Sequence, residues 1–103
     1  MKEEDQRIDE FIVKVIVLKQ NIGGADVENI IDGIDYYERI RLSSNELYFG
    51  LSRLIKFGII KKKEDKYFIA EKYKNYIPYT AKGSVSFSQF KWEAFISKIF
   101  ETR

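Results

Sequence analysis

The stretch from Ser43 to Ala70 constrains the fold of this chain more than any other part of the sequence. Ser43 and Glu46 have the S-x-x-E spacing in which a hydroxyl and a carboxylate bond the free backbone amides at the start of a helix. Apolar residues then recur with helical period and form one stripe, which contains Leu47, Leu51, Leu54 and Ile55. Gly58 follows, at the place where a left-handed residue commonly ends a helix. This part of the stretch therefore predicts a capped amphipathic helix that a glycine terminates.

A basic hairpin is predicted directly after that glycine. Residues 59–63 and 66–70 flank the polar pair Glu64-Asp65, which is typical of two short strands joined by a tight turn. The outward positions of this hairpin carry a group of lysines, namely Lys61, Lys62, Lys63 and Lys66.

Two further helices are predicted before this segment. Residues 5–20 have apolar residues at helical spacing around a wide face, so we expect a helix buried on two sides, although the β-branched run 11–18 also permits a strand. After a break at 21–24, Asp26 is placed to cap a second helix over residues 27–40. Gly33 within it indicates close packing against a neighbouring helix. The outer side of this helix is acidic and carries Glu28, Asp32, Asp35 and Glu38. These carboxylates are either simply solvated or meet basic residues of a partner.

The end of the chain is predicted to form one more helix. A short helical turn or extended arm over 71–79 and a connector of small residues at 80–85 precede it. Ser86 and Gln89 repeat the capping spacing at the start of this final segment, residues 86–103. Its aromatic surface either packs under the first helix or forms a dimer interface, and the residues concerned are Phe90, Trp92, Phe95, Ile96, Ile99 and Phe100. The sequence thus divides into one domain over 1–79, the connector, and this terminal helix.

Composition excludes several classes of function. The 103 residues include no histidine and no cysteine, so imidazole bases, thiolate nucleophiles and most transition-metal sites are ruled out, and we expect neither an enzyme nor a cofactor. The apolar runs are too short to cross a membrane, and no secretory signal is recognisable at the start, so a cytoplasmic protein is expected. Residues 1–38 carry four bases against ten carboxylates, a net charge of −6, whereas residues 39–103 carry fourteen against six, a net charge of +8. The basic part suits a surface that faces a polyanion.

The run Leu51-Ser52-Arg53-Leu54-Ile55-Lys56-Phe57-Gly58-Ile59-Ile60 resembles the "L-S-R-L-x-x-x-G-L-I" phrase of MarR- and PadR-like regulators. The resemblance covers about two-thirds of the chain when the two preceding helices are included. It implies a mostly α fold with a small β-hairpin: a winged helix-turn-helix with a three-helix core, a two-stranded wing and an additional C-terminal helix.

The function implied by this resemblance is that of a homodimeric transcription regulator that binds double-stranded DNA. A recognition helix at about 44–57 would enter the major groove, and a wing at about 59–70 would contact the backbone. Subtracting the apolar stripe leaves Ser44, Asn45, Tyr48, Ser52, Arg53 and Lys56 on the helix, together with the four wing lysines. Arg53 suits guanine, Asn45 suits adenine, and the two serines suit phosphates. Phe49 lies on the same side and fits the core equally well. The alternative is a winged-helix module that binds another protein and does not contact DNA.

Overall fold

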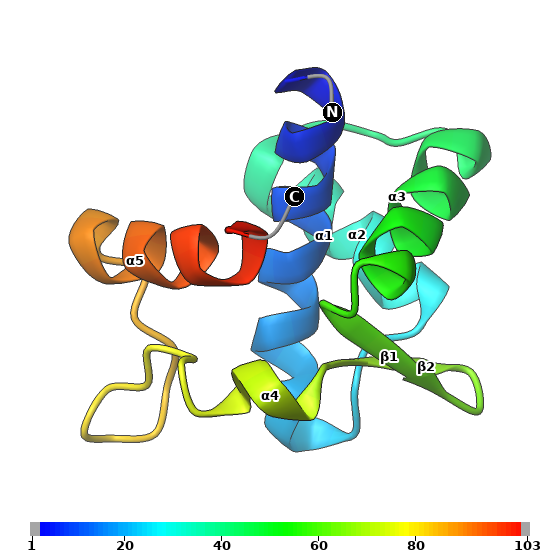
Figure 1. Ribbon diagram of the computed structural model, residues 1–103. Coiled ribbons are helices and arrows are strands. Elements are labelled where there is room, and N and C mark those ends of the chain that lie inside the picture. The colour runs from blue at the N-terminus through cyan, green and yellow to red at the C-terminus, as the bar shows by residue number, and fades with distance from the viewer. Residues whose placement is uncertain (1–2, 102–103) are drawn as a thin grey trace.

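The computed structural model describes residues 3–101, which form mostly helices and one two-stranded antiparallel sheet (Figure 1). In chain order the elements are α1 (Glu3–Lys19), the 3-10 turn η1 (Gln20–Ile22), α2 (Val27–Glu38), α3 (Ser44–Lys56), β1 (Ile60–Lys63), β2 (Lys66–Ile69), α4 (Glu71–Lys74) and α5 (Gln89–Phe100). Within this range no helix combines the length and the apolar character needed to cross a bilayer.

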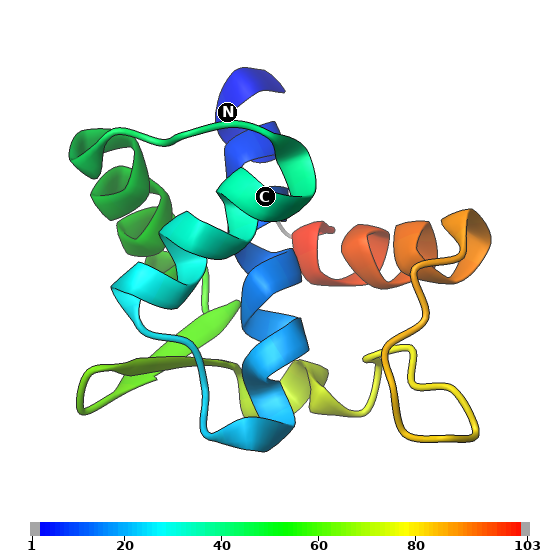
Figure 2. The same ribbon diagram turned by 180° about the vertical axis from the view of Figure 1, so that it is seen from behind.

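Helix α1 lies at the centre of the molecule. Figures 1 and 2 show α2, α3 and the hairpin on one side of it and α5 on the other. Ile12, Val13, Ile16 and Val17 are all buried, which confirms a helix that is covered on two sides and excludes the alternative of a strand over 11–18.

Two of the three predicted N-terminal caps are present, those of α2 and α3. At α2, the Asn29 amide donates to the Asp26 carboxylate at 2.7 Å, and the Asp26 amide donates to the Asn29 side-chain oxygen. At α3, Ser43 and Glu46 make the same reciprocal pair of bonds. Each pair satisfies two backbone amides that have no partner inside the helix, so these starts are fixed by local sequence.

Two glycines have the roles that their positions predict. A Cβ on Gly33 would lie 2.8 Å from a methyl group of Val15, so α1 and α2 approach closely at this point. Gly58 has a φ of +72°, the left-handed conformation that ends the α3 segment. The chain then turns into β1, whose first residue pairs with Ile69 of β2.

The hairpin has the predicted register and one additional pairing. Lys63 lies opposite Lys66, so Glu64 and Asp65 form the turn. The segment between α1 and α2 adds a single bridge, because Ala25 and Tyr67 exchange both backbone hydrogen bonds at 3.1 and 2.7 Å. This bridge joins the hairpin to the helical core.

Three local expectations were wrong. Helix α2 ends at Glu38, since Arg39 adopts a φ of +57° and closes the helix before residue 40. Helix α5 begins only at Gln89, and Ser88 occupies the capping position without a side-chain bond; the Ser86 hydroxyl contacts Ser88. Ile55 is 44% exposed, although it completes the apolar stripe of α3 in sequence.

Helix α5 packs within its own chain. Four of its six candidate interface residues are buried there: Phe95, Ile96, Ile99 and Phe100. Trp92 is partly buried and contacts the rings of Phe87 and Phe95. Phe90 is 85% exposed. The surface that α5 presents to solvent is therefore much smaller than its aromatic sequence implies.

Candidate nucleic-acid interface

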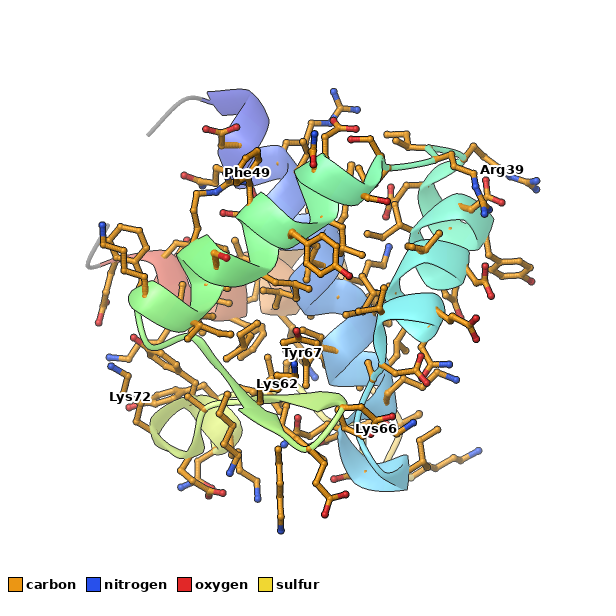
Figure 3. All side chains as sticks on the ribbon, turned by 90° about the vertical axis from the view of Figure 1, so that its right-hand side faces the viewer. Arg39, Phe49, Lys62, Lys66, Tyr67 and Lys72 are labelled. Atoms are coloured by element: carbon orange, nitrogen blue, oxygen red, sulfur yellow. The ribbon has the colours of Figure 1, made fainter. Side chains whose placement is uncertain are left out.

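The outward side of α3 is the largest part of the predicted interface that remains open. Figure 3 views the molecule from this side, with α3 in front, the hairpin below it and α2 beside it. Five of the six predicted helix residues are exposed here: Ser44, Asn45, Tyr48, Ser52 and Lys56. Phe49 is 63% exposed, which resolves its assignment in favour of the surface.

Arg53 is the one predicted DNA-binding residue of α3 that is partly buried rather than exposed. Its Nε and Nη2 atoms donate to the two carboxylate oxygens of Asp9 at 3.0 and 2.9 Å. Asp9 is fully buried on α1, and the hydrogen bond to it raises the pKa of the Arg53 guanidinium above its ordinary value. The Arg53 guanidinium group, which was expected to bind guanine, is therefore occupied by a carboxylate of the same chain, because a buried carboxylate needs a cationic partner.

Asp9 is a functional neighbour of α3 that the sequence did not reveal. It lies 44 residues before Arg53 in the sequence. The only local hint is that Asp9 falls among the apolar residues of α1, which is an unusual position for an acid.

The four wing lysines point to different sides of the sheet. Side chains alternate along a strand, so Lys61 and Lys63 share one face of β1 while Lys62 occupies the other. The Lys62 ammonium lies 5.7 Å from the centre of the Tyr67 ring. Lys66 is bonded to Asp26 at 3.2 Å. Only Lys62 therefore combines an exposed side chain with a position on the face that looks toward α3.

Other cations, absent from the sequence prediction, lie near α3. Figure 3 shows Arg39 and Lys72 on the same side of the molecule as Phe49 and Lys62. Arg39 is exposed at the end of α2. The Lys72 ammonium lies beside Gly58, 3.4 Å from where a Cβ would be. Neither residue belongs to the helix or the hairpin, so only the folded chain brings them to this surface.

Three of the four acidic residues of α2 lie beside residues outside α3. Glu38 pairs with Lys14 of α1 at 3.0 Å. Asp32 lines a hollow of about 350 Å³ that α1 and α2 form together. Asp35 lies 3.6 Å from Arg41, and both of these side chains are more than half exposed. The carboxylates are thus partly neutralised by neighbours within the chain.

Apolar side chains share the outward surface of α3 with the polar ones. Tyr48 is 56% exposed, and Phe57 at the end of the helix is 36% exposed. With Phe49 and Ile55 they make the surface of α3 mixed in character, since three aromatic rings and one aliphatic side chain lie among the polar groups.

Among residues 5–101, whose side chains the structure describes, no three acidic side chains are grouped so that they could hold a metal ion. Searches against protein-family models, curated proteins and solved structures found no match to this chain. The geometry of the chain is accordingly the basis of the proposal that follows.

Proposed function

We propose that this chain is a winged helix-turn-helix protein that binds double-stranded DNA and regulates transcription. Three helices followed by an antiparallel hairpin are the order of that fold, and the Ala25–Tyr67 bridge joins the hairpin to the segment between α1 and α2. In this arrangement α3 is the recognition helix and β1–β2 is the wing.

The observation that carries the proposal is the position of α3. One side of this helix is exposed, carries both polar and apolar side chains and lies beside the hairpin, with Arg39, Lys62 and Lys72 on the same side of the molecule (Figure 3). Cations around a protruding helix attract the phosphates that border a major groove, while the helix itself meets the base edges.

The assignment of base contacts changes because Arg53 is paired. Asn45 is placed to read adenine through its amide, and Ser52 is placed to reach either a base or a phosphate. Lys56, with Arg39, Lys62 and Lys72, supplies the phosphate contacts. On this surface, the cations that can contact the DNA backbone outnumber the side chains that can distinguish bases. We therefore expect modest sequence specificity.

A salt titration tests the proposal. Fluorescence anisotropy of labelled duplexes should show binding that weakens steeply with salt, and Lys56→Gln and Lys72→Gln should each reduce the slope of log K against log [salt] by about 1. Lys91→Gln, an exposed lysine on α5, is the matched control and should leave the slope unchanged. Absence of binding to every duplex at low salt, or equal effects of all three variants, would contradict the proposal.

Homodimer formation is the second part of this proposal. Phe90 is the apolar residue that α5 leaves most exposed, and Tyr76, Pro78 and Ala94 line a shallow hollow beside it. Burying Phe90 against a second copy would remove this ring from water. Sedimentation equilibrium should then find a dimer that Phe90→Ser dissociates, and a monomer at all concentrations would refute it.

One observation favours a second candidate function, a protein-binding module. Tyr48 and Phe49 are large exposed rings on α3, and aromatic residues are enriched in protein interfaces. Phe49→Ala separates the two candidates. Loss of a protein partner, by a chain whose wild type binds no duplex, supports the module, whereas loss of affinity for DNA places the ring in the DNA interface.

A further inference from the structure

A small hollow lies on the face of the hairpin opposite Lys62. Its volume is about 200 Å³, and it is formed where the sheet meets η1 and α4. In Figure 1 the hairpin, α4 and the chain that follows α1 come together at the lower end of the molecule. The residues lining the hollow are Gln20, Asn21, Lys61, Lys63, Phe68 and Lys74.

Gln20 is the unusual member of this group. It is only 8% exposed, and its side-chain oxygen accepts the backbone N–H of Ile69 at 2.8 Å. Since a backbone amide can only donate, this bond fixes the orientation of the Gln20 amide and turns its Nε2 group away from the strand.

No acceptor within residues 3–101 is hydrogen-bonded to that Nε2 group. A buried amide donor without a partner costs more than a typical hydrogen bond contributes, so such groups normally have a water or a ligand as acceptor. Gln20 therefore presents unused donors to the hollow.

The charges around the hollow are mainly positive. Lys61, Lys63 and Lys74 line it, and the carboxylate of Glu71 lies 2.6 Å from the Lys61 ammonium and 3.7 Å from that of Lys74. Lys61 and Lys74 lower the pKa of Glu71 and keep it ionised. Lys63 has no carboxylate within ion-pair distance among the described residues. Three ammonium groups thus face one carboxylate.

We propose that this hollow binds a phosphate group, with Gln20 Nε2 and the Lys61, Lys63 and Lys74 ammoniums as its donors. The donors suit an oxyanion because several charge-assisted hydrogen bonds converge on one small volume. The hollow is smaller than typical pockets for drug-sized ligands, which favours inorganic phosphate or the terminal phosphate of a small metabolite. The inference is independent of DNA binding by α3, because the hollow and Lys62 lie on opposite faces of the sheet.

The test is a titration of the ¹⁵N-labelled protein with inorganic phosphate at constant ionic strength. The side-chain amide signal of Gln20 should shift and saturate, since that group donates directly to the anion. Lys63→Gln should weaken binding about tenfold, whereas Lys62→Gln should change it by less than about twofold because it removes the same charge from the opposite face.

Two further variants examine the geometry. Gln20→Glu keeps the acceptor for Ile69 but replaces the donor by a carboxylate, so phosphate binding should be lost while the fold is retained. Glu71→Gln removes the negative charge that competes with the anion for Lys61 and Lys74, and binding should tighten about threefold.

Three results would overturn the inference. The first is a Gln20 side-chain signal that responds to neither phosphate, nor a phosphomonoester, nor a short duplex. The second is equal weakening by Lys62→Gln and Lys63→Gln, which would show diffuse attraction of ions. The third is a Gln20 signal that responds to a short duplex but to neither phosphate nor a phosphomonoester, which would make the hollow part of the DNA interface. Saturable shifts with phosphate or a phosphomonoester support the site, and the ligand that binds more tightly identifies its source.

Discussion

Replacement of Arg53 by methionine tests the most consequential contact in the structure. The change keeps an unbranched side chain on α3 but removes both hydrogen bonds to Asp9, a carboxylate with no solvent exposure. Breaking a buried ion pair by deleting one partner typically costs about 3–5 kcal/mol, because the remaining charge stays desolvated. The Arg53 side chain is 24% exposed, so water reaches part of the site and we expect the lower limit, about 3 kcal/mol.

Urea unfolding followed by circular dichroism measures this loss. With a denaturant dependence of about 1.5 kcal/mol per molar urea, 3 kcal/mol lowers the midpoint by about 2 M. Lys56→Met is the control, since it removes an exposed cation from the same helix and should cost no more than about 0.5 kcal/mol. The double variant Asp9→Leu/Arg53→Met should recover part of the loss because no charge remains buried. A loss below about 1 kcal/mol for Arg53→Met would refute the reasoning, since that is the cost of breaking an exposed pair.

Two local features give further predictions. Gly33→Ala should lower the melting temperature even though alanine favours a helix by about 1 kcal/mol, because its Cβ would clash with Val15 across the α1–α2 contact; an unchanged or higher value would show that Val15 can move. Asp26→Ala should cost about 1 kcal/mol at pH 7 through loss of the cap. The bond from the Asn29 amide lowers the pKa of Asp26 in the folded state, so this contribution is present above the ordinary carboxyl pKa. This contribution to stability should decrease as the pH falls from the ordinary carboxyl pKa toward the lower pKa of Asp26 in the folded state. A difference between variant and wild type that stays constant on acidification would contradict the role of the charge, and thermal melts over a pH series measure both effects.

Much of the helix and hairpin pattern was predictable because it depends on residues that are close in sequence. The Ser43–Glu46 cap spans three positions, and the conformation at Gly58 follows from the absence of a side chain. The strands on either side of Glu64-Asp65 pair as predicted because a two-residue turn fixes which neighbouring residues lie opposite each other. One failure was equally local: the Ser86–Gln89 spacing matched a cap, but α5 begins at Gln89 and Ser88 occupies the capping position without a side-chain bond.

The candidate site was less predictable because exposure is decided by distant neighbours. Subtraction of the apolar stripe placed Arg53 on the surface, but the periodicity of α3 contains no information about a carboxylate on α1. The same procedure counted Ile55 as buried, although no element covers it completely. Arg39 and Lys72 were overlooked because neither lies in the segment that the pattern defined.

The sequence by itself determined the order of the helices and the hairpin, the capped starts of α2 and α3, and which side of α3 contains its apolar stripe. The tertiary structure alone decided that Arg53 is bonded to Asp9, that Gln20 is bonded to Ile69 at a separation of 49 residues, and that Lys62 and Lys63 face different surroundings. The physical reason is one of range. Caps, turns and periodicity arise from backbone bonds within one or two turns of chain, whereas the state of a polar group depends on which distant atoms remove it from water and which then bond to it.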